Sequence, residues 1–240
     1  MSDNPLPIEF TTSRGTETIY PVVLESDKKK ILVDCGYPGF GPLLEQALLA
    51  KGTSFSALTD IIITHHDLDH VGALHEIVQQ YPHLRIHASS VEREFIEGRQ
   101  KAPRLIQAEK LFATLPEHMK PGALQFQKTL EAIQPVAVTG ALASGTHAFA
   151  GIKVIATPGH TPGHISLYLH DSKTLIAGDA LVYADGKLGI ANPEFTLDLP
   201  EAIRSVQKLA ELEILTLICF HGGAVTQPAE LLRDLLAVFY

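Results

Sequence analysis

The chain has 240 residues, of which 45% are hydrophobic and 19% charged, and its formal net charge is -8 at pH 7. This length and composition suit one globular domain over residues 1–240, or a domain with a modest insertion. The acidic balance argues against a surface that binds a phosphate backbone, so nucleic acid is not an expected partner. No apolar run approaches the length of a membrane span, and the first residues lack the features of a secretory signal. We therefore expect a cytoplasmic protein that does not contact a membrane.

The first part of the chain alternates between predicted strands and helices. Short apolar runs rich in β-branched residues predict strands at residues 8–10, 18–24, 31–34, 58–63 and 84–88. Apolar residues at helical spacing predict helices at residues 41–51 and 71–81. This alternation favours α/β layering. Cys35 ends one predicted strand and Cys219 another, where a free cysteine usually behaves as a small buried hydrophobe.

The loop between the predicted strand 58–63 and the predicted helix 71–81 carries an unusual density of polar groups. His65, Asp67, Asp69 and His70, all able to bind a metal, lie within six residues. Such a loop lies at the edge of a packed layer, where open α/β sheets usually place their chemistry. Like charges and desolvation both oppose this crowding, and a divalent cation would compensate for them.

Residues 91–132 differ from what precedes them, because they are charged, favour helix and contain breaks at Pro103, Pro116 and Pro121. They also carry many apolar side chains. We predict a helical insertion, with two functions left open. It either roofs the site and shapes a substrate pocket, or it is a helix layer or the contact of a possible homodimer.

Predicted strands return in the second half of the chain, at residues 153–156, 165–169, 174–177 and 214–220, with helices at 200–212 and 228–239. Three of these strands lead into further ligand-type residues, His160, Asp179 and His221. Each of the three lies beside glycine or in a turn, where a side chain can face a cleft. Four strand ends therefore carry metal-type ligands, which core packing does not explain.

In this order, Thr64–His70, the histidine after Thr157-Pro158-Gly159, Gly178-Asp179 and the late His221 form a specific pattern. The chain resembles the metallo-β-lactamase-fold hydrolases over nearly its whole length, in particular the glyoxalase II-like and lactonase-like single-domain members. The resemblance implies an α/β (α+β) fold, a four-layer αββα sandwich with the site at one edge of its two sheets.

The resemblance also implies a ligand set for two divalent metal ions. His65, Asp67 and His160 would hold one ion, Asp69, His70 and His221 the second, and Asp179 would bridge them. His66 fills a variable position, and His164 would fix a neighbouring ligand by a hydrogen bond. The family pattern is Thr-His-x-His-x-Asp-His, so Asp67 stands where a histidine is usual. The expected metal is zinc, and the added oxygen ligand shifts preference toward iron or manganese.

The implied mechanism uses a metal-bridging hydroxide to attack a small-molecule ester or lactone, or else a thioester or phosphotriester. Asp69 would hold or shuttle the proton, and Tyr183 would either donate to the substrate carbonyl oxygen or simply fill the core. Two other classes remain open from sequence. One is a mononuclear iron dioxygenase of the same fold, and the other is a ligand-binding or regulatory protein that retains the metal.

Overall fold

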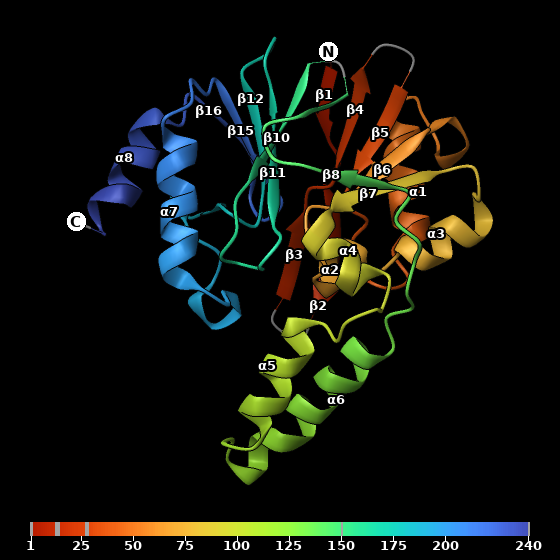
Figure 1. Cartoon of the computed structure of the whole chain (residues 1–240), viewed down its shortest axis with the longest axis vertical. Helices are drawn as coiled ribbons and strands as arrows, with labels where there is room; N and C mark the ends of the chain where they lie inside the picture. The colour runs from red at the N-terminus through yellow and green to blue at the C-terminus, as the bar shows by residue number, and fades with distance from the viewer. Residues whose placement is uncertain (1, 13–14, 27–28, 150, 240) are drawn as a thin grey trace.

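Two six-stranded β-sheets lie face to face in the centre of the computed structural model, which describes residues 2–12, 15–26, 29–149 and 151–239 (Figure 1). The first sheet has the order β1 (Ser2–Pro5), β4 (Val22–Ser26), β5 (Lys29–Val33), β6 (Asp60–Ile62), β7 (Arg85–Ser89) and β8 (Gly140–Leu142). The second has the order β16 (Gly223–Thr226), β15 (Thr216–Cys219), β12 (Thr174–Gly178), β11 (Ile165–Leu169), β10 (Ile152–Ala156) and β9 (His147–Phe149).

Helices cover the outer face of each sheet. On the first sheet these are α1 (Gly41–Ala50), α2 (Leu68–Val71), α3 (Leu74–Gln80) and α4 (Ser90–Ile96). On the second they are α7 (Leu199–Ala210) and α8 (Ala229–Ala237). One buried cluster joins the facing sheets through residues such as Leu24 and Leu167, and two others join each sheet to its helices. The predicted four-layer αββα sandwich is confirmed.

A helical hairpin projects from one end of the sandwich (Figure 1). It consists of α5 (Pro103–Phe112), the 3-10 turn η2 (Glu117–Met119) and α6 (Lys120–Glu131), and α5 packs against α6. The helix α4, by contrast, packs on β7 and β8 of the first sheet. The projecting part of the expected insertion 91–132 therefore starts at Pro103. None of the helices among the described residues is long and apolar enough to cross a membrane.

The remaining elements are small. Two short hairpins, β2 (Ile8–Thr12) with β3 (Gly15–Ile19) and β13 (Val182–Ala184) with β14 (Lys187–Gly189), accompany the 3-10 turns η1 (Phe55–Ala57) and η3 (Pro193–Phe195). The helix predicted at residues 71–81 corresponds to α3, and the short helix α2 precedes it, separated by Gly72 and Ala73. A Cβ atom on Gly72 would collide with Pro38, so only glycine allows the backbone at residue 72 to lie this close to Pro38.

Strand direction brings the predicted ligand loops to one edge. In the first sheet β5, β6, β7 and β8 are parallel. In the second, β11 is antiparallel to both β10 and β12, and β12 is parallel to β15, so β10, β12 and β15 all end on the same side. At that edge the backbone N–H of Ile165 donates to the carbonyl of Thr64 at 3.2 Å, which links the two sheets.

Candidate metal centre

The structure brings all seven predicted ligand residues together at this edge. They come from the loop after β6 (His65, Asp67), from α2 (Asp69, His70) and from the ends of β10, β12 and β15 (His160, Asp179, His221). Their ligand-type atoms form two sets, one of His65, Asp67 and His160 and one of Asp69, His70, Asp179 and His221. Within each set the atoms lie no more than 4.8 Å apart.

In the first set the carboxylate of Asp67 faces both imidazoles. Its Oδ2 lies 3.0 Å from His160 Nε2 and 3.6 Å from His65 Nε2. All three residues are buried. Three buried groups that converge in this way are typical of a cation site.

In the second set Asp179 lies between the other ligands. Its Oδ1 is 3.3 Å from His70 Nε2, and its Oδ2 is 3.6 Å from His221 Nε2. The same Oδ2 lies 3.6 Å from His160 Nε2 in the first set. Asp179 therefore touches both sets, as a residue shared by two ions would.

Several buried polar atoms of the two sets make no hydrogen bond to any described residue, and these are His65 Nε2, His70 Nε2, His160 Nδ1 and Asp179 Oδ1. His70 Nε2 and Asp179 Oδ1 are close, but not in hydrogen-bonding geometry. Leaving such atoms without partners is costly in a folded protein. Imidazole and carboxylate are ligands that zinc, iron and manganese accept, so the donor set fits divalent ions.

Asp34 and Thr64 fix the tautomers of two of these histidines. Asp34 Oδ2 accepts a hydrogen bond from the Thr64 hydroxyl at 2.9 Å and contacts His70 Nδ1 at 2.9 Å. Because a carboxylate only accepts, the His70 proton is on Nδ1. The Thr64 hydroxyl donates to Asp34, so it accepts from His65 Nδ1 at 3.0 Å. When these imidazoles are neutral, both Nε2 atoms therefore carry a lone pair toward the site.

Burial and charge set the pKa values of the free site. Burial lowers the pKa of His65 well below its usual range, and His70 nearby adds to the effect. Burial also opposes the charged form of His70, but the carboxylates of Asp34, Asp179 and Asp69 outweigh it and hold its pKa well above the usual range. Burial would raise the pKa of Asp179, yet His221 and His70 hold it well below. Neutral His65 and ionised Asp179 favour cation binding, whereas His70 has to release its additional proton when a cation binds.

Two residues outside the seven behave as the sequence suggests. His164 Nε2 accepts the backbone N–H of Asp179 at 3.0 Å, so it orients that loop, and burial lowers its pKa to about 3. His66 turns away from the two sets, and its Nδ1 lies 2.5 Å from Glu92 Oε2. Glu92 also accepts from Thr161 and from the backbone of Gly163, and so ties the loops of the two sheets together.

Sequence reasoning missed Glu92 and Arg104. Arg104, in the projecting helix α5, donates from Nε to Asp67 Oδ1 at 3.0 Å and from Nη2 to Oδ2 at 2.5 Å. Neither residue belongs to a motif, and each is far along the chain from the residue that it contacts. A buried arginine on a helix that otherwise reads as exposed gives no signal of its own in a single sequence.

Comparison with known proteins identifies the family of the chain. The family model described as the metallo-beta-lactamase superfamily matches residues 14–221. The chain belongs to the metallo-beta-lactamase superfamily. Among curated relatives, the probable metallo-hydrolase YflN of Bacillus subtilis (strain 168) is 30% identical over 224 residues, 87% of this chain and 81% of that protein. A hydroxyacylglutathione hydrolase of Synechococcus sp. (strain JA-2-3B'a(2-13)) is 31% identical over 172 residues, 68% of this chain and 54% of that protein.

Solved structures of the superfamily share the fold. The metallo-beta-lactamase family protein TTHA1429 from Thermus thermophilus superposes with a TM-score of 0.74 at 25% identity, covering 99% of this chain and 79% of that one. TTHA1623 in a di-iron-bound form has a TM-score of 0.62 at 22% identity, covering 92% and 96%. AidC, a dizinc quorum-quenching lactonase, has a TM-score of 0.60 at 21% identity, covering 88% and 76%. These structures show a shared fold, and the family model together with relatives such as the probable metallo-hydrolase YflN places the chain among metallo-hydrolases.

A cavity of about 720 Å³ opens onto both sets of candidate ligand residues. Its wall includes Asp69, Asp179, His221 and Tyr183, with many aromatic and aliphatic side chains around them. Tyr183, on β13, also packs against the core of the second sheet, and its backbone N–H donates to the carbonyl of His221 at 2.9 Å. Tyr183 therefore lies between the cavity and the core of the second sheet.

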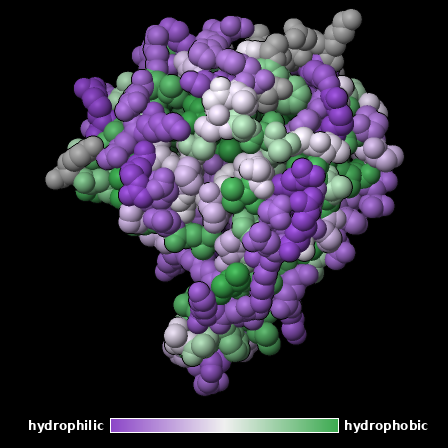
Figure 2. Space-filling model, in the orientation of Figure 1, coloured by the Kyte–Doolittle hydropathy of each residue, from purple (hydrophilic) through white to green (hydrophobic). Residues whose placement is uncertain are grey.

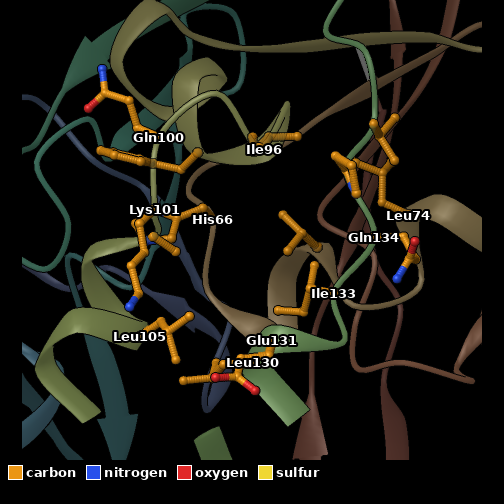
Figure 3. A pocket seen from close by; sticks show the side chains of 16 residues that line it. His66, Leu74, Ile96, Gln100, Lys101, Leu105, Leu130, Glu131, Ile133 and Gln134 are labelled. Atoms are coloured by element: carbon orange, nitrogen blue, oxygen red, sulfur yellow. The ribbon is translucent and has the colours of Figure 1, made fainter. Parts of the chain in front are cut away.

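A second cavity, of about 370 Å³, lies beside His66 in the loop that follows β6 (Figure 3). It is lined by His66, Phe95, Ile96 and Leu74, and by Lys101 and Leu105 at the start of the projecting hairpin. It contains none of the seven ligand residues. Of these two cavities, only the larger opens onto the candidate ligand residues.

Proposed function

We propose that the protein is a metal-dependent hydrolase that cleaves a small ester or lactone, with two divalent ions held by His65, Asp67, Asp69, His70, His160, Asp179 and His221. The observation that carries this proposal is the contact of Asp179 with both sets of ligand atoms, at 3.3 Å from His70 and 3.6 Å from His160. Zinc is the ion we expect, with iron or manganese as alternatives, because relatives of this fold include dizinc and di-iron proteins.

Side chains of this site have separate tasks in the proposed reaction. When bound, the ions would supply a water of lowered pKa and a Lewis acid for the substrate carbonyl. Asp69 lines the cavity, and its Oδ2 lies 3.0 Å from His221 Nε2, so it is placed to hold the proton that the water loses. Tyr183 also faces the cavity, where its hydroxyl would donate to the carbonyl oxygen of the substrate.

Aromatic side chains in the lining of the cavity indicate an apolar substrate part. Phe10, Tyr37 and Phe40 form one wall, with ring centroids 5.1–5.3 Å apart. Phe126 of α6 and Phe195 belong to the rest of the lining. Such a pocket favours an aliphatic or aromatic acyl or alcohol group. A lactonase and a hydroxyacylglutathione hydrolase among the similar proteins agree with cleavage of an ester-type bond.

We further propose that residues 1–240 act as one domain in which the hairpin α5–α6 is a wall of the substrate site. Arg104, Phe126 and Leu130 of this hairpin line the cavity. The hairpin also exposes Ile106, Leu111, Met119 and Leu124. Figure 2 shows hydrophobic (green) surface among hydrophilic side chains on the projecting part of the molecule. The exposed side chains of the hairpin differ from those that line the cavity, so the hairpin can form a homodimer contact and a wall of the substrate site at the same time.

The test combines metal analysis with an activity panel. Protein purified without added metal would be analysed for its metal content and assayed on esters of increasing acyl length, lactones, thioesters and phosphotriesters. We expect two metal ions per chain and hydrolysis of an ester or lactone. His160→Ala and Asp179→Ala should abolish it, while His170→Ala, at the far end of β11, should leave it unchanged. Full turnover in both site variants would refute the proposal, as would one iron per chain with oxygen uptake.

A further inference from the structure

Arg104 makes the closest contact between the projecting hairpin and the candidate metal centre. Its side chain is almost entirely enclosed, with a residue exposure of 3%, and Asp67 is 7% exposed. Three hydrogen bonds join them, from Arg104 Nε to Asp67 Oδ1 at 3.0 Å and Oδ2 at 3.1 Å, and from Nη2 to Oδ2 at 2.5 Å. The geometry is that of a charge-assisted pair of the strong kind.

The surroundings hold the guanidinium on Asp67. Arg104 Nη1 donates to Gln107 Oε1 at 2.6 Å, and the guanidinium carbon lies 5.7 Å from the centre of the Phe195 ring. In Figure 3 the neighbouring residues Lys101 and Leu105 point into the second cavity beside His66. Arg104 turns the other way, toward Asp67, and lines the larger cavity.

This arrangement brings a permanent positive charge against a candidate cation site. Arg104 Nη2 lies 3.5 Å from His160 Nε2, and both it and His160 lie against Asp67. An arginine side chain does not lose its proton in a protein. A cation held by His65, Asp67 and His160 would therefore meet one negative charge, on Asp67, and one positive charge, on Arg104.

We propose that Asp67 and Arg104 act as one electroneutral unit that stands where the superfamily pattern has a neutral histidine. Asp67 contributes an oxygen ligand and a charge of -1, and Arg104 cancels that charge without touching the cation. Arg104 is thus a positioning residue that orients Asp67 and sets the net charge of the first ligand set. This inference rests on the proposed metal site, and not on the identity of the substrate.

A purely structural role would be different. If Arg104 only attached the hairpin to the sandwich, its loss would lower the stability of the protein. Cation affinity would then fall with the disturbance of the fold. The charge pairing instead predicts a ranking of cation affinity among the wild type and three variants. Counting Asp67 as -1 and Arg104 as +1, the local charge is 0 in the wild type, -1 in Arg104→Met, +1 in Asp67→His and 0 in the double variant. Cation affinity should rise with negative charge.

The experiment is a titration of metal-free protein with Zn²⁺ against a chromophoric chelator, for the wild type and these three variants. We expect Arg104→Met to bind Zn²⁺ more tightly than the wild type, by roughly tenfold or more, and Asp67→His more weakly by a similar factor. The double variant should return close to the wild type. The matched control is Arg85→Met, which removes an arginine from another buried carboxylate, Asp60, at the opposite end of β6 and should leave Zn²⁺ binding unchanged.

Thermal unfolding of the metal-free proteins supplies a second readout. Each single variant leaves a buried charge without its partner and should lower the midpoint, whereas the double variant should lose less than the two single losses combined. Weaker Zn²⁺ binding by Arg104→Met, or a double variant no better than Asp67→His, would overturn the inference. A wild type that binds no Zn²⁺, iron or manganese, with the unfolding midpoints still non-additive, would instead overturn the proposed function and leave the pair intact.

Discussion

Asp34 supports His70 from behind, with its Oδ2 2.9 Å from the imidazole Nδ1. The other oxygen, Oδ1, accepts the backbone N–H of Thr64 at 2.8 Å. Asp34 holds a left-handed backbone conformation, with φ of +63°, directly after β5. A non-glycine residue is strained there, and the strain persists because two hydrogen-bond partners and the end of a parallel strand fix its place.

Asp34→Ala is expected to weaken metal binding without removing a ligand. His70 would lose the group that keeps its proton on Nδ1, so its Nε2 lone pair would no longer be held toward the site. We expect about 10- to 100-fold lower affinity for Zn²⁺ in a chelator competition assay. The control is Asp60→Asn, a buried aspartate at the start of β6 whose partners include His87 and Arg85. If both variants bind as the wild type does, Asp34 merely caps its loop.

The His66–Glu92 pair predicts a defined pH dependence of stability. Burial opposes both charges, but Glu92 raises the pKa of His66, and His66 lowers the pKa of Glu92. Stability from a raised histidine pKa is complete below the ordinary value of 6.5 and is lost as pH rises through the folded value. Stability from a lowered carboxyl pKa is complete above the ordinary value of 4.5 and is lost as pH falls through the folded value. The full contribution therefore lies between those two ordinary values.

Glu92→Gln should remove this contribution. Denaturant unfolding of the wild type and the variant should differ most between about pH 4.5 and 6.5, and the gap should narrow on both sides. Glu94→Gln, on the same helix but paired with Arg99 at the surface, is the control and should show a much smaller gap. A gap that is constant from pH 4 to pH 8 would mean that the ion pair contributes nothing.

The layers of the fold and the convergence of the candidate ligand residues were predictable, because both follow from strands that are visible in the local sequence. Apolar runs before His65, His160, Asp179 and His221 are long enough to reveal buried strands, and parallel strands deliver their carboxyl ends to one edge. The close approach of Pro38 to Gly72 was not predictable, because it joins two segments that are distant in the chain. The short hairpin β13–β14 was missed for a similar reason, since Val182–Ala184 and Lys187–Gly189 carry too few apolar residues for a periodicity.

Arg104 shows the limit for the site itself. Sequence identifies Asp67 as an unusual ligand, but it offers no way to choose which of the 19 basic residues neutralises it. Arg104 pairs with Asp67 because of the position of the hairpin α5–α6 on the sandwich. That position depends on tertiary packing, and residues of the hairpin line both cavities. The two charges are 37 positions apart in the chain.

Both cysteines should be inert in the folded protein. Cys35 and Cys219 are completely buried. Burial raises the pKa of the Cys35 thiol well above its usual value, with Asp34 adding to the effect, and burial likewise raises that of Cys219. A thiol-specific chromogenic reagent at pH 8 should titrate no cysteine in the native state and both in denaturant. Rapid reaction of either thiol under native conditions would contradict the buried interpretation.

Gly222 is expected to be required for the position of His221. Its φ is +113°, and a Cβ atom there would collide with the backbone carbonyl of Tyr183, which is held in β13 and cannot readily move away. Gly222→Ala should therefore lower the free energy of unfolding by about 1–3 kcal/mol and reduce Zn²⁺ retention, since the collision displaces the loop that carries His221. The control is Gly186→Ala in the turn of β13–β14, where φ is +77° but no atom lies within 4 Å of the added Cβ. Gly186→Ala should cost some stability through its backbone angle and leave Zn²⁺ retention unchanged. Equal Zn²⁺ retention in the two variants would show that the collision at Tyr183 does not position His221.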